Sequence, residues 1–379
     1  MISKDIIALR HTLHAQPEVS NDEYGTAEII KAYMEQYAPS EIIAGIGGSG
    51  VAVVYAFDRP GKTITIRCEL DALPIQEANH MSYRSKHAGV SHKCGHDGHM
   101  AIVASLGAWL REGHIDSGKV VLLFQPAEEN GQGAARVMAD PRFQALGSDY
   151  IFALHNLPKA PLHDIIWMPA GFSAEVYSVI VRLTGKESHA AEPENGINPT
   201  LAISAIATQC AQLNVSDPED PSYAVLTPVH IQVGQPSYGI SPGQGEIHYT
   251  IRTWNKEEMD ALKTRILGVV SEVCDTHHLA HDVEWLEYFP ASINDAASNE
   301  VVRQAALAND FTLSERGYPF KFGEDFGWYG DQYKSAIFGL GAGLDTPALH
   351  HADYDFPDEI IGTGAAMFKS IIQHILKTQ

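Results

Sequence analysis

The order of predicted strands and helices changes near residue 172 and changes back near residue 289, and this change constrains the fold most. Strands are predicted at residues 50–57, 62–68, 119–124 and 150–154, and helices at 4–14, 24–37 and 97–112. Such alternation is typical of an α/β layer structure. From 174 to 288 the predicted order is instead β-α-β-β-α-β, the ferredoxin-like order. The α/β character then returns, with helices near 298–309 and 359–377 flanking the strand "SAIFGLG" at 335–341.

We therefore predict an α/β protein that carries an inserted α+β domain. The α/β domain would comprise residues 1–172 and 289–379, and the ferredoxin-like insert residues 173–288. A chain of 379 residues is long enough for two domains of unequal size.

Charge and cysteine content narrow the function classes. The chain has 26 basic and 47 acidic residues and a net charge of −21, which would repel nucleic acids and anionic membranes. The N-terminal stretch "MISKDIIALR" is charged and lacks the apolar segment of a signal peptide, and there is no apolar run of membrane length. Four scattered cysteines do not resemble a disulfide framework. These features indicate a cytoplasmic protein with no nucleic-acid or membrane partner.

Metal-capable side chains follow the ends of several predicted strands. They are Glu69 and Asp71, Glu128 and Glu129, His155, and His350 and His351. The segment "SHKCGHDGHM" adds Cys94 and His96 just before a predicted helix, whose N-terminus would favour a thiolate at Cys94. Its C-x-H spacing is not that of a structural zinc module, so further ligands must come from elsewhere.

Each of these residues has an ordinary interpretation when taken alone. Cys94 could be a small buried residue, the glutamate pair a solvated pair, and His155 a hydrogen-bonded residue at a strand end. Open α/β sheets place their sites beyond the carboxyl ends of strands. Acidic and imidazole groups gathered at one such edge would need a cation to offset their charge, so the sequence predicts a metal site there.

An ordered set of motifs resembles a known family over almost the whole chain. The motifs are "LRHTLHAQPEVSNDEYGTAEII", "DALPI", "KCGHDGHMA", "FQPAEE", "ALHNLP", "SHAAEP", "GEDFGWY" and "LHHADYDFPDE". They are similar to motifs of the cocatalytic dimetal peptidase and aminoacylase family, in its amidohydrolase branch. That branch includes hippurate hydrolase, N-acetyldiaminopimelate deacetylase and hydrolases of auxin conjugates. The resemblance implies a metallopeptidase-like catalytic domain with an inserted lid and dimerisation domain.

The resemblance also implies roles for individual residues. Five would hold two divalent metal ions, with the thiolate of Cys94 bridging them: Cys94, His96, Glu129, His155 and His350. Glu128 would be the catalytic base, and Asp71 would orient a ligating imidazole. Thiolate, imidazole and carboxylate ligands together suit zinc, manganese, cobalt or nickel, so the metal stays open.

The predicted insert supplies two further candidates. His189 matches a family histidine that faces the active site of a neighbouring subunit, where it could stabilise an oxyanion; it implies a homodimer formed through the inserted domain. Arg252 could bind a substrate carboxylate, or could simply be an exposed strand arginine. Two positions depart from the family pattern, in which Glu69 is usually Asp and Gly239 of "GISP" is commonly an Asn that resembles a substrate-carboxylate contact.

These features predict an amidohydrolase that removes the acyl group of an N-acylated amino acid or a similar small amide through a metal-activated water. A dipeptidase or carboxypeptidase of the same fold is the alternative enzyme. A non-catalytic metal-binding or ligand-binding protein is a third possibility, against which the presence of Glu128 speaks. Because neighbours in an extended segment point in opposite directions, we expect Glu128 and Glu129 to diverge unless the chain turns sharply after Pro126.

Overall fold

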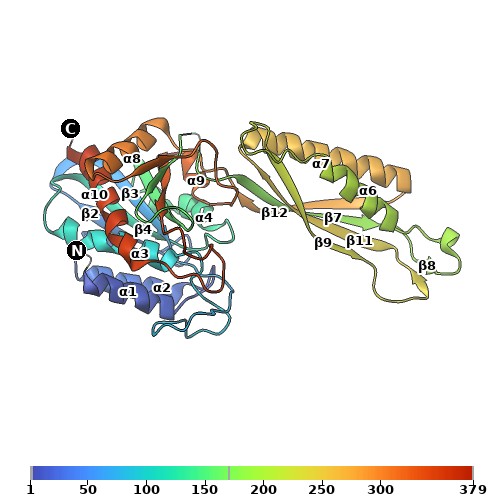
Figure 1. Cartoon of the computed structure of the whole chain (residues 1–379), viewed down its shortest axis with the longest axis horizontal. Coiled ribbons are helices and arrows are strands. Elements are labelled where there is room, and N and C mark those ends of the chain that lie inside the picture. The colour runs from blue at the N-terminus through green and yellow to red at the C-terminus, as the bar shows by residue number, and fades with distance from the viewer. Residues whose placement is uncertain (1–2, 170, 378–379) are drawn as a thin grey trace. The chain divides into compact units, whose positions relative to one another are not determined.

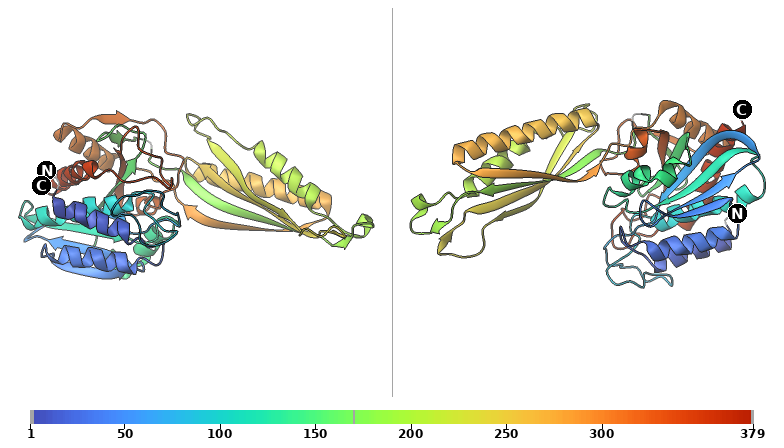
Figure 2. Two further views of the ribbon diagram at one scale, coloured as in Figure 1. Left: turned by 60° about the horizontal axis from the view of Figure 1, so that its bottom comes forward. Right: turned by 180° about the vertical axis from the view of Figure 1, so that it is seen from behind.

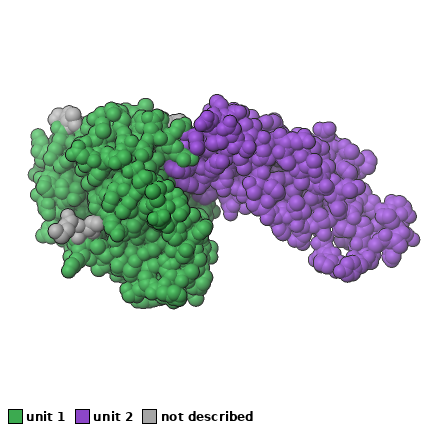
Figure 3. Space-filling view, viewed as in Figure 1, with its two compact units in different colours: residues 1–172, 292–317, 324–379 green, residues 173–291, 318–323 purple. Residues whose placement is uncertain are grey.

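The computed structural model describes residues 3–169 and 171–377, and the chain divides into two compact units (Figure 3). Unit 1 comprises residues 1–172, 292–317 and 324–379, and unit 2 comprises residues 173–291 and 318–323. This stretch of unit 2 ends at residue 291 rather than at the expected residue 288, because strand β12 (Ala280–Phe289) runs past the expected boundary. The expectation also missed residues 318–323, which join unit 2 because the amide of Ala174 donates to Phe320 O at 2.9 Å.

Unit 1 is built on one eight-stranded sheet of order β1-β2-β4-β3-β5-β14-β6-β13 (Figure 1). Its strands are β1 (Glu41–Ile46), β2 (Gly50–Ala56), β3 (Arg59–Glu69), β4 (Ser117–Gln125), β5 (Tyr150–Leu157), β6 (Ile165–Trp167), β13 (Leu313–Glu315) and β14 (Lys334–Gly341). The four central strands, β4, β3, β5 and β14, are parallel to one another. Their carboxyl ends therefore lie at one edge of the sheet.

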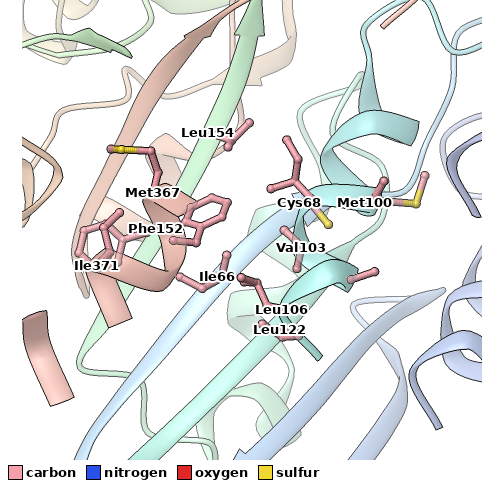
Figure 4. Close-up of a cluster of buried hydrophobic side chains, with 14 of the residues drawn as sticks. Ile66, Cys68, Met100, Val103, Leu106, Leu122, Phe152, Leu154, Met367 and Ile371 are labelled. Atoms are coloured by element: carbon pink, nitrogen blue, oxygen red, sulfur yellow. The ribbon is translucent and has the colours of Figure 1, made fainter. Parts of the chain in front are cut away.

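Helices pack on both faces of this sheet. The main core is formed with α1 (Lys4–Ala15), α2 (Tyr24–Glu35), α3 (His96–Arg111), α8 (Ala296–Ala308) and α10 (Ile361–Lys377). Figure 4 shows Ile66 and Phe152 of the strands among Val103 of α3 and Ile371 of α10. The short helices α4 (Gly133–Ala139), α5 (Pro141–Gln144) and α9 (Gly327–Gly330) belong to the other side. This arrangement confirms the predicted α/β class.

Alternation along β3 separates apolar from polar residues. Ile64, Ile66 and Cys68 belong to the main hydrophobic core. Arg67 and Glu69 alternate with them, point to the opposite face, and are also fully buried.

The short elements β1, β6, β13, α4, α5 and α9 were not predicted, because three to seven residues carry too little periodicity to reveal an element.

Unit 2 has the predicted β-α-β-β-α-β order. It consists of β7 (Glu175–Thr184), α6 (Thr200–Ala211), β9 (Ala224–Val233), β11 (Gln244–Thr253), α7 (Lys256–His277) and β12, with sheet order β12-β7-β11-β9. Both helices pack on one face of the antiparallel sheet (Figures 1 and 2). Two additional short strands, β8 (Ser188–His189) and β10 (Ile240–Ser241), pair with each other, and the turn η1 (Pro193–Asn195) follows β8.

Candidate metal centre

The five predicted ligand residues come together at the carboxyl edge of the parallel strands of unit 1. Their ligand atoms form two overlapping groups, Cys94 with His96 and His155, and Cys94 with Glu129 and His350, each within 4.8 Å. His96 is the first residue of α3, and His155 lies two residues before the end of β5. Cys94 belongs to both groups, so its sulfur lies between two candidate ion positions.

The distances between these side chains fit ligands arranged around a cation. His96 Nε2 lies 3.9 Å from Glu129 Oε1, and His350 Nε2 lies 3.8 Å from Glu129 Oε2. Both separations are too long for hydrogen bonds. Cys94 Sγ lies 3.5 Å from His155 Nε2. Ligands bound to one ion at about 2.0–2.3 Å are separated by roughly 3–4 Å, so these spacings suit metal binding.

Hydrogen bonds on the far side of two imidazoles set their orientation. His96 Nδ1 donates to the backbone carbonyl of Asp71 at 2.8 Å, and His155 Nδ1 donates to the carbonyl of Asn156 at 2.8 Å. A carbonyl can only accept, so Nδ1 carries a proton, and in the neutral ring each Nε2 presents a lone pair. Among the described residues, the buried His96 Nε2 and Glu129 Oε1 make no hydrogen bond. The donor set therefore fits a divalent cation.

Asp71 supports this group in a different way from the one expected. Its carboxylate Oδ1 lies 3.5 Å from His96 Nδ1, whereas its backbone carbonyl receives the short bond. Its Oδ2 accepts from Ser20 Oγ at 2.7 Å and from the amide of Glu129 at 2.9 Å. Burial opposes ionisation, but His96 and these hydrogen bonds lower the pKa of Asp71. The carboxylate is thus held charged while it fixes the loop that carries Glu129.

The chain turns sharply between β4 and the glutamate pair. Ala127 has a φ of 52°, and the turn places oxygens of both Glu128 and Glu129 at 3.9 Å from His96 Nε2. The segment is therefore not extended, and it meets the stated exception to the expected divergence, a sharp turn after Pro126. Glu128 is buried, and the amide of Asp325 donates to its Oε1 at 3.4 Å.

Burial dominates the protonation of Cys94, Glu129 and His155, whereas burial opposes protonation of His96 but Asp71, Glu69 and Glu129 raise its pKa to about 10. Burial and the carboxylates of Glu129 and Glu128 raise the pKa of the Cys94 thiol well above its ordinary value. Burial also raises the pKa of Glu129 to about 7 and lowers that of His155 to about 3. The helix N-terminus expected to favour a thiolate does not outweigh these effects. A bound divalent cation would reverse them, because it stabilises deprotonated ligands.

A buried charge cluster beside the centre was missed from sequence. Arg67 Nη2 lies 3.0 Å from Glu324 and 2.6 Å from Asp325, Nη1 contacts Glu69, and Nε donates to Gln125 at 2.9 Å. The "GEDF" motif contains both acidic residues. Arg67, however, lies 257 residues before Glu324 in the chain, and a pairing over that distance leaves no local signal in the sequence.

Glu69 connects this cluster to α3. Its Oε2 lies 2.6 Å from His99 Nδ1, and the amide of Asn156 donates to His99 Nε2 at 3.1 Å. His96 and His99 are three residues apart on one helix, a spacing that places both on the same face and that could have revealed the pair.

A second buried network anchors the start of α3. His14 lies 2.8 Å from Asp97 and 2.9 Å from Glu77, Arg10 lies 3.1 Å from Asp97, and Lys93 lies 2.6 Å from Glu77. Burial opposes protonation, yet the two carboxylates raise the pKa of His14 to about 9. The opening motif that contains Arg10 and His14 therefore holds the residues on either side of Cys94 and His96.

The two remaining predicted site residues lie in unit 2. His189 is exposed on β8, and its Nδ1 accepts from the amide of Ala191 at 3.0 Å, so a neutral ring carries its proton on Nε2. Arg252 lies on β11, donates to the carbonyl of Lys321 at 2.8 Å, and has its pKa lowered by burial. His351 is exposed and belongs to neither group of Cys94.

Comparisons with known proteins agree on one family. The model of the Peptidase family M20/M25/M40 matches residues 65–374. N-acetyl-L-cysteine deacetylase of Bacillus subtilis is 31% identical over 95% of this chain and 85% of its own. Hippurate hydrolase of Campylobacter jejuni is 26% identical over 97% and 96%. A B. subtilis crystal structure described as a dinuclear metal-binding M20 peptidase has a TM-score of 0.85 at 26% identity, covering 99% of this chain and 98% of that one. In residues 3–169 and 171–377, no helix has the length and apolar character needed to cross a membrane.

Proposed function

Since the chain belongs to the Peptidase family M20/M25/M40, we propose that it is a metal-dependent amidohydrolase acting on N-acylated amino acids or similar small amides. Relatives named as a deacetylase and a hippurate hydrolase support an amide bond as the target. The single observation that carries the proposal is the overlap of two ligand groups at Cys94. We propose that Cys94, His96, Glu129, His155 and His350 hold two divalent ions there.

Such ions would acidify a water and polarise the scissile carbonyl. The protein residues supply the remaining steps. Glu128 is the proposed base: its carboxylate is buried beside the ligands, where it can take a proton from the attacking water and return it to the departing amine. Asp71 keeps His96 and Glu129 in place through its carbonyl and its Oδ2.

Zinc, manganese, cobalt and nickel all suit this ligand set. Prolonged chelation should abolish hydrolysis of N-acetyl and N-benzoyl amino acids, and one of these ions should restore it. Elemental analysis of each reloaded sample identifies the metal that supports activity. Full activity in verified metal-free protein would contradict the proposal.

Paired variants separate the base from the ligand. Glu128→Gln keeps size and shape but removes the proton acceptor, so kcat should fall by roughly 10²-fold or more with metal content unchanged. Glu129→Gln should lose metal first and activity as a consequence. Normal turnover by Glu128→Gln with its metals retained would exclude Glu128 as the base.

A dipeptidase or carboxypeptidase remains the alternative for the same centre. A dipeptide has a free amino group at its N-terminus, whereas an N-acyl amino acid has none. A substrate panel that pairs each N-acyl amino acid with the matching dipeptide therefore separates the two activities. Higher kcat/KM for the dipeptides would favour the alternative.

We further propose a homodimer in which His189 serves the centre of the partner. Strand β9 is an edge strand of the sheet, bridged on its outer side by Val215 at Ala224, and its Val229 and Ile231 are 60% and 51% exposed. The Nε2 proton of His189 could stabilise an oxyanion. Mixing inactive Glu128→Gln with inactive His189→Gln protein should restore part of the activity, because one centre of a mixed dimer would be intact. No recovery in mixtures shown by mass spectrometry to exchange subunits would exclude action between subunits.

A reducing compartment, the cytoplasm, is the location that we propose. Cys94 must stay a thiol to bind metal, and the four cysteines form no disulfide in the described structure.

A further inference from the structure

A second group of metal-capable side chains lies in unit 2, outside the candidate metal centre. His230 on β9 and His248 on β11 are directly paired across the two strands, and Glu246 precedes His248 by two residues on the same face. The ligand atoms of these three side chains lie within 4.8 Å of one another. We propose that His230, Glu246 and His248 form a site for a divalent transition-metal ion.

The distances suit coordination better than hydrogen bonding. His248 Nε2 lies 3.3 Å from Glu246 Oε1, and His230 Nε2 lies 3.8 Å from the same oxygen. Ligands of a tetrahedral zinc ion with bonds of about 2.0–2.1 Å lie roughly 3.3 Å apart. His248 Nε2 is buried and makes no hydrogen bond among the described residues, although the oxygen is near. An ion between the three atoms would satisfy this nitrogen after only a small movement of His230.

The surrounding charges favour a cation. Arg182 of β7 faces Glu246 from the other side, with its Nε 3.8 Å from Oε2, so Oε1 is left toward the imidazoles. The same guanidinium also lies 2.8 Å from Glu284 and 3.5 Å from Asp282. Three carboxylates thus surround one positive charge, and the excess negative charge attracts a divalent ion.

The backbone and the adjacent space also fit a binding site. The pairing of β9 with β11 shifts register between His248 and Tyr249, a bulge directly beside the histidine pair. On the other side, Glu246 borders a hollow of about 670 Å³ that is also lined by Arg182 and Gln232 but by neither histidine. Three protein ligands leave at least one coordination position open for water or a small ligand. Two imidazoles and a carboxylate suit Zn²⁺, Cu²⁺ or Ni²⁺.

The test counts metal beyond the catalytic centre and is independent of hydrolysis. Protein loaded at its catalytic centre and freed of loose metal is titrated with Zn²⁺ by calorimetry, with elemental analysis after gel filtration. The wild type should bind about one ion more than the double variant His230→Gln/His248→Gln, and Glu246→Gln should bind that ion at least about tenfold more weakly. His281→Gln, which changes an exposed histidine of β12, is the matched control and should behave as the wild type.

A spectroscopic arm identifies the ligands. Cu²⁺ added to the loaded protein should give an electron paramagnetic resonance signal with coupling to imidazole nitrogen, and this signal should vanish in the double variant. Equal metal stoichiometry in the wild type and the double variant, or a Cu²⁺ signal that survives in the double variant, would overturn the proposed site.

Discussion

Replacing Arg67 with methionine should strongly destabilise unit 1. Arg67 is fully buried and contacts three carboxylates, those of Glu69, Glu324 and Asp325. Methionine fills a similar volume but leaves these carboxylates without their cation. Removing one partner of a buried ion pair costs about 3–5 kcal/mol. At about 2–4 °C per kcal/mol for a domain of this size, we expect the Tm to fall by roughly 6–20 °C.

The loss should depend on pH in a defined direction. Burial opposes ionisation of Glu69, but Arg67 holds its pKa well below the ordinary value. The stabilisation from this pairing is present above the unfolded pKa of about 4 and is lost as the pH falls through the folded pKa. Without Arg67, burial raises the pKa of Glu69, so its carboxyl group takes up a proton more readily at pH 5 than at pH 8. The difference in Tm between variant and wild type should therefore be larger at pH 8.

Thermal unfolding followed by circular dichroism on metal-free protein measures the effect. Arg59→Met is the matched control, because Arg59 lies on the same strand β3 in an exposed ion pair with Asp116, and it should cause no measurable change. A Tm within about 2 °C of the wild type at both pH values would refute the assigned role of Arg67.

Three further outcomes are expected. Cys94→Ser should lower metal content and turnover together, because a neutral hydroxyl is a poorer ligand than a thiolate; unchanged metal content would return Cys94 to a packing role. Gly239→Asn restores the family's asparagine, which resembles a contact to the substrate carboxylate, and there is room for it because no atom lies within 4 Å of an added Cβ. It should lower KM for N-acyl amino acids but not for their carboxamides; equal effects on both substrates would argue against carboxylate recognition. The raised pKa of His14 stabilises the fold fully below its unfolded value of about 6.5, and this contribution is lost as the pH rises through about 9. Unfolding free energy measured in urea should therefore decline over this range in the wild type, and His14→Gln should flatten the decline; a parallel decline in the variant would assign it to other groups.

The sequence allowed the edge of the sheet that carries the centre to be predicted, because strand periodicity is a local signal. His155 near the end of β5 and Glu129 after β4 could be expected together once the strands were expected to be parallel. The β-α-β-β-α-β order of unit 2 was equally predictable, since the six elements that make it up each span at least ten residues.

Long-range pairings and local turns were not predictable in the same way. Nothing around Arg67 indicates that its partners are Glu324 and Asp325, because only the folded chain brings the three together. The positive φ of Ala127 also leaves no clear signal in its residue type, yet it decides where Glu128 points. The raised pKa of the metal-free Cys94 thiol was likewise not predictable, because burial depends on the whole fold.

The assignment of residues 318–323 to unit 2 has a consequence for dissecting the molecule. The polypeptide passes between the two units four times, so no single cut separates them. A fragment spanning residues 173–291 would lack the segment whose Phe320 carbonyl accepts from Ala174. A graft of unit 2 from a relative must therefore replace both stretches, and the last of its four junctions falls immediately before Glu324, a partner of Arg67. Exchanging unit 2 between relatives thus alters the surroundings of the buried Arg67 cluster as well.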